Sequence, residues 1–389
     1  MLAGLALADD AWRWAEASRQ GGFDVAHEPL QPGWVVNGLI VALEPVQLAL
    51  IRLVDRLALR ATGAKPPARV AMSLPSSAVL MHRTWVPPHL SEAALQALCR
   101  EQATDWLPLP LSEMVLEAAL NEAVMAKPPR GDDASEEGGL PQAVWVAATR
   151  LERVTQALSL SEAAGLTLCV LETESCAYRR AVLESPMAQE TKRPVRSPIR
   201  SPTGASLGQL LALCWLSQDT TQLQLLQSTG SQWVLLEEQT LAWGSRHWVI
   251  PPSDPSLNRE SGPGTLPEAI EGVLNRFLQG QKLNEPSQVD PTTGTPVAPA
   301  LPAWAGIYVG GSLPDWWLDL PPAERQLKLN GHHGHDGHLG NPVESEVESR
   351  AVDVFLFAPL MAHQERRDAP HFGVACGLVQ IDNQAPQKT

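Results

Sequence analysis

Apolar and polar positions along the first sixty residues follow the spacing of strands and then of a helix. Apolar residues at 5, 7 and 11, with two tryptophans following, predict a strand over residues 4–17, and residues 23–30 predict a second. Residues 35–40 predict a strand that contains a turn. From residue 45 to residue 59 apolar side chains recur at helical spacing, which predicts a helix that ends near Gly63.

The segment from residue 70 to residue 111 has the clearest pattern in the chain. Two apolar runs, 70–74 and 78–86, lie on either side of a Pro-Ser-Ser turn and predict two short strands. Ser91 is typical of a helix N-cap and precedes an apolar-periodic stretch that predicts a helix over 91–106. Pro108 ends this helix, since proline cannot continue one. We expect these strands and this helix to form one compact unit.

The remaining periodic segments alternate between the two kinds of element, which is typical of an α/β protein. Gly165 stands at the position that closes a helix. The predicted strands are 114–120, 143–148, 168–171, 210–216, 222–227, 233–238, 305–309 and 352–356, the predicted helices are 150–164, 174–183, 266–279 and 371–380, and 314–319 and 322–329 are predicted to be short helices or turns.

A chain of 389 residues is long enough for two domains. Residues 184–206 are rich in serine and proline and have no hydrophobic period, so we interpret them as a linker. The expected domains are therefore 1–183 and 207–389. The expected flexible loops of the second domain are 251–264, 283–303 and 330–349.

Composition excludes several classes of protein. The net charge of −14 argues against non-specific nucleic-acid binding. The five cysteines form no CxxC pair, so neither a disulfide framework nor a zinc knuckle is indicated. No apolar run reaches the roughly 18 residues of a transmembrane helix, and we expect no direct insertion into a membrane. A histidine-rich run over 331–338 lies on a glycine-rich segment, and we assign it no structural metal.

Five short motifs occur in an order that resembles the PilM family of type IV pilus assembly proteins. They are G-W-V-V-N-G-L-I at 33–40, V-W-V-A-A at 144–148, L-S-E-A-A-G-L-T-L-C-V-L at 160–171, I-Y-V-G-G-S-L-P at 307–314 and F-G-V-A-C-G-L at 372–378. The resemblance runs nearly end to end. It implies an actin-like (ribonuclease H-like) two-domain α/β fold related to that of FtsA. A small inserted α+β subdomain is expected near 33–120.

The two phosphate-binding hairpins of that family are altered in this chain. Ala6 stands where the family has its first aspartate, and Asp9 and Asp10 stand where it has serine. Trp215 replaces the aspartate of the second hairpin. Carboxylates beside a triphosphate would repel it unless a metal ion intervened. We therefore expect a pseudo-ATPase with no catalytic residue and no cofactor. The alternative is that ATP and Mg²⁺ bind through altered contacts.

Residues 310–312 resemble the glycine loop of the family, so Gly310, Gly311 and Ser312 are the candidate vestigial nucleotide loop. Trp85 and Trp106 are candidate partner-binding anchors, because tryptophan buries a large area at an interface. The alternative for both tryptophans is ordinary core packing.

The function implied by the resemblance is that of a cytoplasmic scaffold in the inner-membrane alignment complex of the type IV pilus, which supports twitching motility. It would bind the N-terminal tail of a PilN-type single-span membrane protein and other cytoplasmic pilus components. A protein partner would hold it at the inner membrane. The alternatives are an ATP-binding actin-like regulator of pilus assembly and a type II secretion cytoplasmic adaptor of related fold.

Overall fold

The computed structural model of the protein describes most of the first half of the chain and separate segments of the second half. The described residues are 2–19, 22–60, 69–120, 142–185, 209–229, 232–242, 244, 272, 274, 288–289, 296–297, 304–311, 326–330, 349–356 and 373–380.

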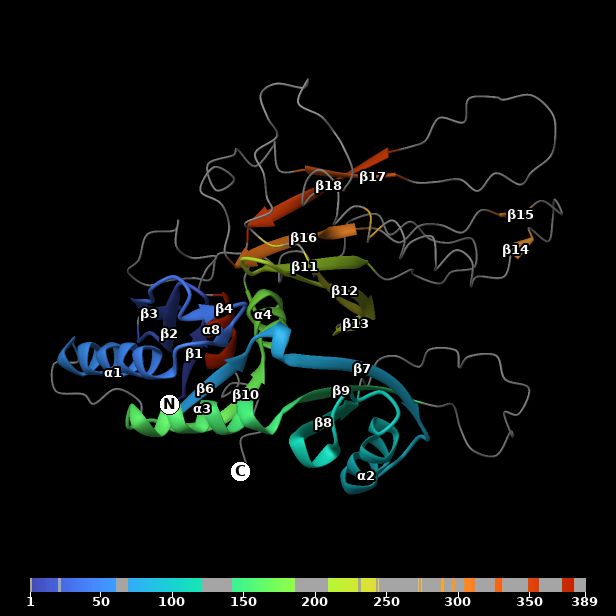
Figure 1. The fold of residues 1–389 in the computed structure, drawn as a ribbon. Helices are drawn as coiled ribbons and strands as arrows, with labels where there is room; N and C mark the ends of the chain where they lie inside the picture. Colours follow the sequence, from blue (N-terminus) through green and yellow to red (C-terminus); the bar gives the residue numbers. More distant parts are fainter. Residues whose placement is uncertain are drawn as a thin grey trace, which may run out of the picture.

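The first sheet has five strands in the order β10-β6-β1-β2-β3 (Figure 1). They are β1 (Ala3–Leu7), β2 (Ala11–Ala17), β3 (Phe23–Pro29), β6 (Arg69–Leu74) and β10 (Thr167–Thr173). β1, β2 and β3 are antiparallel neighbours, whereas β6 is parallel to both β1 and β10. The single strand predicted over 4–17 is wrong. The chain turns at residues 8–10, and the apolar run continues on both sides of that turn, so the pattern did not reveal the break.

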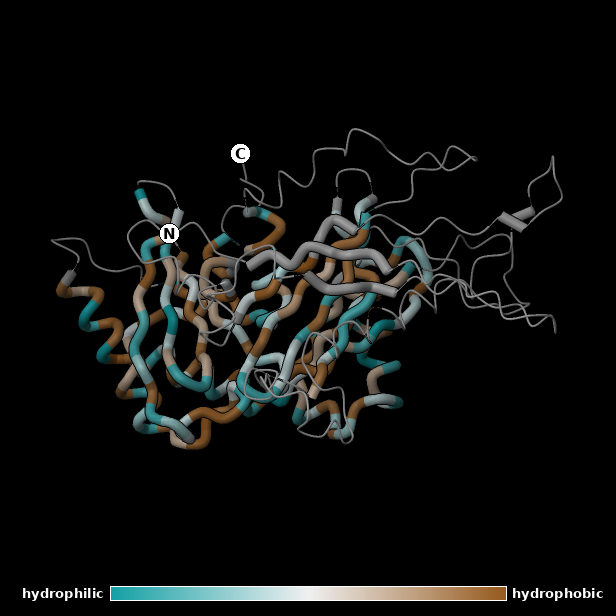
Figure 2. The backbone as a smooth tube through the Cα atoms, turned by 90° about the horizontal axis from the view of Figure 1, so that it is seen from above, coloured by the Kyte–Doolittle hydropathy of each residue, from teal (hydrophilic) through white to brown (hydrophobic). Residues whose placement is uncertain are grey.

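Four helices cover the two faces of this sheet. On one face, α1 (Leu43–Arg60) and α3 (Leu151–Ala163) contribute Leu50, Leu53 and Leu160 to a core with Trp12 and Trp14 of β2. The opposite face packs against α4 (Glu174–Leu183) and α8 (Gly373–Val379). In Figure 2 hydrophobic residues (brown) and hydrophilic residues (teal) alternate along the turns of α1. One side of that helix is therefore apolar and is the side that is buried.

The second sheet has the order β13-β12-β11-β16-β18-β17, so its first five strands repeat the arrangement of the first sheet. They are β11 (Leu210–Leu216), β12 (Thr221–Thr229), β13 (Gln232–Leu241), β16 (Trp304–Gly311), β18 (Ser349–Leu356) and the antiparallel edge strand β17 (Gln326–Asn330). The prediction of a helix or turn over 322–329 is wrong for residues 326–329. Leu327 and Leu329 have the alternation of a strand, but the run is too short to have stood out.

Helices α4 and α8 lie between the two sheets and contribute to one core that the two sheets share (Figure 1). One continuous buried cluster joins Ala6 of the first sheet, Tyr178 of α4, Ala375 of α8 and Leu213 of the second sheet. The last described helix of the chain therefore packs on the first strand.

A third, smaller sheet has the order β7-β9-β8, with α2 (Glu92–Ala103) packed on one face. Its strands are β7 (Val79–Val86), β8 (Met114–Leu120) and β9 (Gln142–Arg150). Ser91 is the N-cap of α2, as predicted, and accepts a hydrogen bond from the amide of Ala94. The predicted unit of 70–74, 78–86 and 91–106 is wrong in one respect. The short helix η1 (Ser76–Ala78) separates β6, in the first sheet, from β7, in the small sheet.

The small sheet with α2 spans residues 79–150, which differs from the inserted subdomain expected near 33–120. Within that expected range, α1 packs on the first sheet, and β4 (Val35–Val36) pairs only with β5 (Leu39–Ile40) among the described strands. β9 follows β8 by more than twenty residues, and no local pattern indicates that these two strands pair.

Most other predicted elements are confirmed. Gly165 has a φ of +70°, as a helix-closing glycine should. Residues 288–289 and 296–297, predicted to be loop, pair as the short strands β14 (Gln288–Val289) and β15 (Pro296–Val297). Several predicted segments lie outside the described residues. They are the linker except for 184–185, the loop 251–264, nearly all of the helix 266–279, residues 314–319, and nearly all of the loop 330–349 with its histidine-rich run.

Gly4 makes the docking of α8 on β1 sterically possible. A Cβ at Gly4 would lie 1.9 Å from the carbonyl oxygen of Ala375. We expect Gly4→Ala to lower the melting temperature strongly, because the helix must move away from the strand. The control is Gly33→Ala, where φ is +87° but nothing lies within 4 Å, so only about 1 kcal/mol of backbone strain is added. Equal melting temperatures for the two variants would contradict this account.

Candidate functional site

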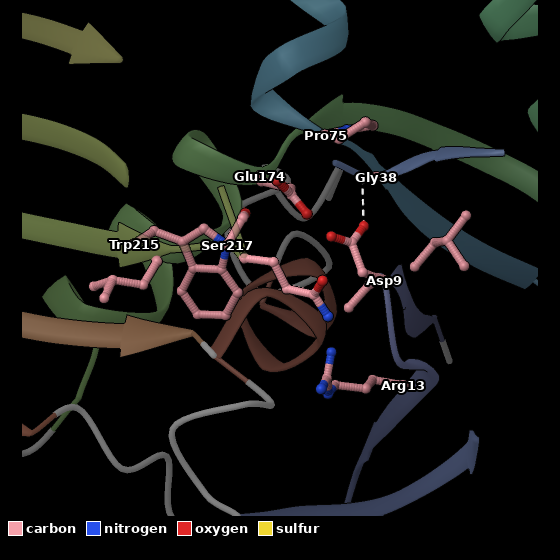
Figure 3. A pocket seen from close by; sticks show the side chains of 11 residues that line it. Asp9, Arg13, Gly38, Pro75, Glu174, Trp215 and Ser217 are labelled. Atoms are coloured by element: carbon pink, nitrogen blue, oxygen red, sulfur yellow. Dashed lines mark hydrogen bonds between the residues drawn. The ribbon is translucent and has the colours of Figure 1, made fainter. Parts of the chain in front are cut away.

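The structure places the β1–β2 turn and the β11–β12 turn, the candidate phosphate hairpins of the sequence, against each other at a narrow interdomain cleft (Figure 3). The cleft has a cavity of about 20 Å³. A cavity of this size holds about one water molecule. It is lined by Leu7, Ala8, Asp9, Arg13, Gly38, Pro75, Glu174, Trp215, Leu216, Ser217 and Gln218.

Two carboxylates in the interdomain cleft accept hydrogen bonds from the chain itself. Asp9 accepts the amide of Gly38 at 2.7 Å, the dashed line in Figure 3, and Glu174 accepts the amide of Ser76 at 3.2 Å. Desolvation raises the pKa of Asp9, partly offset by that hydrogen bond. Desolvation is also the largest cause that raises the pKa of Glu174, to about 7, and the charge of Asp9 adds to it.

The cation of the interdomain cleft is already paired. Arg13 donates to both carboxylate oxygens of Asp10 at 2.9 Å, and its side chain is only 7% exposed. The charges of Asp10 and Asp219 further raise the pKa of Asp9. An incoming phosphate would therefore meet acidic groups without an open cationic partner among the residues that line the cleft.

Aromatic side chains fill the interface between the two sheets next to the interdomain cleft. Tyr178 of α4 lies against Trp215 of β11, with ring centroids 4.9 Å apart and planes at 47°. The ring of Tyr178 also covers Gly310, since a Cβ there would lie 2.9 Å from it. Gly310 and Gly311 end strand β16 and pair with residues 215 and 216. They are strand residues and not the loop predicted from the sequence, because a Gly-Gly pair does not distinguish the two. Ser312 lies outside the described residues.

A second and larger depression lies between the small sheet, the first domain and β13. We call it the apolar groove. It has a volume of about 540 Å³. Its lining comprises Leu74, Val79, Met81, Val115, Glu117, Trp145, Ala147, Ala148, Thr149, Val154, Leu171, Glu172, Thr173, Cys176, Arg179, Trp233 and Leu235.

Strand alternation explains most of the small-sheet wall of the apolar groove. Met81 of β7, Ala147 of β9 and Glu117 of β8 are register partners and share the face opposite α2. Arg83, on the same face, donates to the carbonyl oxygen of Leu236 in β13 at 3.2 Å. The small sheet is thereby tied to the second sheet.

Two residues that line the apolar groove each carry a buried donor atom that lacks a hydrogen-bond partner in the part of the chain that the structure describes. These atoms are Nε1 of Trp145, on β9, and Nη1 of Arg179, on α4. The other terminal nitrogen of Arg179, Nη2, contacts the sulfur of Cys176 at 3.6 Å. Both donor atoms are closed off from solvent, so the open surface of the groove is mainly apolar.

Neither candidate anchor from the sequence lines the apolar groove. Trp106 lies on the α2 side of the small sheet, where it stacks on His82 with ring centroids 4.5 Å apart. Trp85 shares the groove face of β7, but its ring is covered by the guanidinium of Arg83 at 5.2 Å. Sequence reasoning missed Trp145 and Trp233. Trp145 stands between Val144 and Val146 in a predicted strand. Its side chain therefore points to the face opposite to theirs, and this alternation was the available signal.

No helix in the described ranges combines the length and the apolar character that crossing a membrane would require.

Comparison with known proteins gives one family match and several structural ones. Residues 16–194 match the model of the family described as type IV pilus assembly protein PilM. The chain is similar in structure to the PilM–PilN type IV pilus biogenesis complex, with a TM-score of 0.59 and 18% identity over 97% of each chain. The predicted actin-like, two-domain α/β fold is confirmed by this likeness.

Two weaker structural likenesses carry no argument of their own. The cytoplasmic domain of EpsL, an inner-membrane component of the Vibrio cholerae type II secretion system, matches with a TM-score of 0.36 and 10% identity over 81% of this chain and 83% of that one. The ethanolamine utilization protein EutJ from Carboxydothermus hydrogenoformans has the same score and identity over 97% and 88%.

We predict that Glu174→Gln removes a pH dependence of folding stability. The pKa of Glu174 is raised from 4.5 to about 7, so the folded state binds more protons than the unfolded state. Stability therefore falls as pH rises from about 4.5 to about 7, by about 3 kcal/mol, and is constant beyond. Denaturant unfolding of both proteins at pH 4.5, 6 and 8 tests this. An unchanged slope of stability against pH in the glutamine variant would contradict it.

Proposed function

Because the chain belongs, through residues 16–194, to the PilM family of type IV pilus assembly proteins, we propose that it is a scaffold without ATPase activity. In this role it binds the N-terminal tail of a PilN-type single-span membrane protein in the apolar groove. That partner holds it at the cytoplasmic face of the inner membrane. There it couples the membrane components of the pilus to other cytoplasmic pilus components.

The observation that carries the tail-binding proposal is the apolar groove. A cavity of about 540 Å³ is large enough for several side chains of an extended segment. Met81, Trp233 and Leu235 supply apolar contacts from facing walls.

The energetic demand on such a complex is modest. A micromolar dissociation constant corresponds to about 8 kcal/mol. Ordering a flexible tail costs entropy, so a few buried side chains must supply most of the affinity. The similar PilM structure is that of a complex with PilN, which supports the same kind of partner for this chain.

The interdomain cleft supports the absence of ATP hydrolysis. The volume of about 20 Å³ leaves no room for a nucleotide unless the two sheets separate. Separation would break the contact between Tyr178 and Trp215 and would expose their buried rings to water. Asp9 and Glu174 would then face the phosphates.

We predict that Ala147→Arg abolishes tail binding. Ala147 lies in the middle of the small-sheet wall of the apolar groove, so a long side chain there occupies the space of the tail. Isothermal calorimetry with a synthetic N-terminal peptide of the PilN-type protein measures the affinity. We expect at least a 100-fold loss, by analogy with interface hot spots.

The control for this experiment is Leu80→Arg. Leu80 precedes Met81 on β7, points to the opposite face and is 43% exposed, so arginine is tolerated there. Both variants should keep the melting temperature of the wild type within a few degrees. Equal peptide affinity for wild type and Ala147→Arg would show that the tail binds elsewhere.

We predict no binding of Mg-ATP at concentrations up to about 1 mM, since nucleotide entry must disrupt the aromatic contact and bring phosphates beside carboxylates. Calorimetry and thermal-shift measurements with and without Mg-ATP test this. A low-micromolar dissociation constant that Trp215→Asp or Asp9→Ala changes would locate a nucleotide in the interdomain cleft and overturn the pseudo-ATPase proposal.

A further inference from the structure

We propose that the tail of the PilN-type partner binds as an added β-strand at the outer edge of β10, so that the five-stranded first sheet gains a further strand. The inference rests on the proposed tail-binding function. It adds to that function the secondary structure of the bound tail and the chemistry that its bound segment must have.

Strand β10 ends the first sheet on one side in the part of the chain that the structure describes. It pairs with β6, and no described strand pairs with its other edge. The bulge at Cys169 interrupts the register, but pairing is regular from Val170 to Thr173. Because alternate residues of a strand direct their main-chain N–H and C=O groups away from the partner strand, an edge strand offers these groups to an extended peptide.

The apolar groove meets β10 along this edge. Residues 171–173 are consecutive, and all three line the groove. Since successive side chains of a strand point to opposite faces, a groove that touched only one face would contact alternate residues. β7 shows that pattern, because it contributes Val79 and Met81 without Leu80. β9 contributes the consecutive residues 147–149, but it is paired with β7 and β8 and has no free edge.

The helices that cover the two faces of the first sheet both reach the apolar groove. Val154 comes from α3, which packs on the same face as α1. Cys176 comes from α4, which packs on the opposite face. The groove therefore continues the layer of the sheet between these two helices, which is the position of a next strand. Ala147 of the small sheet lies on the far wall of that space.

A strand in this position is covered on both of its faces. Its alternate side chains face Val154 on one side, and Trp233 and Leu235 on the other. Strands that are buried on both faces are continuous apolar runs, whereas strands with one face in water alternate between apolar and polar residues. The bound segment of the tail is therefore a continuous apolar run about as long as residues 170–173.

The first test uses synthetic N-terminal peptides of the PilN-type protein in which one main-chain amide at a time is replaced by an ester. The ester removes a single N–H donor, adds no bulk and leaves every side chain unchanged. We expect binding to the full chain, measured by isothermal calorimetry, to weaken about fivefold at alternate positions of the apolar run. Esters at the intervening positions are the matched controls and should bind as the parent peptide does.

The second test measures amide hydrogen exchange of the full chain with and without the parent peptide. The amides of β10 that point away from β6 should exchange more slowly when the peptide is bound, because they then donate to its carbonyl oxygens. Strand β3 is the internal control, since it forms the opposite edge of the same sheet. Its exchange should not change.

The outcomes separate this inference from the proposed function. A parent peptide that binds without alternation among the esters, or without slower exchange in β10, overturns the inference and leaves the proposed function intact. Slower exchange in β7 or β8 in place of β10 assigns the added strand to the small sheet and also overturns it. Slower exchange in β10 at rising protein concentration without peptide assigns the edge to a second copy of the chain, with the same consequence. A parent peptide that does not bind overturns the proposed function and the inference together.

Discussion

The arrangement of the molecule depends on one shared apolar layer, in which α4 and α8 pack between two sheets of the same strand order. Tyr178 shows how this layer connects the two sheets. Its ring contacts Trp215 and Gly310 of the second sheet while its helix packs against the first. The close approach of α8 to Gly4 locks the other helix of the layer onto β1. The two sheets are thus joined by buried side chains of the chain itself.

This layer explains the opposite character of the two depressions. In the interdomain cleft, the polar groups of Asp9, Glu174 and Arg13 have partners within the chain, and the remaining cavity is about 20 Å³. In the apolar groove the cavity is about 540 Å³ and its walls are mainly apolar. A peptide can bury apolar side chains in the groove, whereas the cleft has room for about one water molecule, and this difference is the physical basis for proposing a peptide scaffold.

The same helix, α4, serves both depressions. Its first residue, Glu174, lines the interdomain cleft, whereas Cys176 and Arg179 line the apolar groove. Glu174 also accepts the amide of Ser76, at the short helix that connects the first sheet to the small sheet. One wall of the groove and one wall of the cleft are therefore formed by the same helix.

The sequence by itself determined most of the local elements. Alternation and helical spacing identified β3, α1, α4 and the strands of the second sheet other than β17, and Ser91 and Gly165 identified ends of helices. These signals are local, because each depends on the spacing of neighbouring side chains. The replacement of aspartates at Ala6 and Trp215 was inferred instead from the resemblance to the PilM family.

Only the tertiary structure decided which of these elements meet. β6 and β7 are neighbours in sequence yet belong to different sheets, and β8 and β9 pair across more than twenty residues. Trp106, chosen from the sequence as an anchor, packs on His82, whereas Trp145 lines the apolar groove. A local pattern gives the period of a strand or helix but not the partner of either face. Long-range packing sets that partner, and with it the groove and the filled cleft.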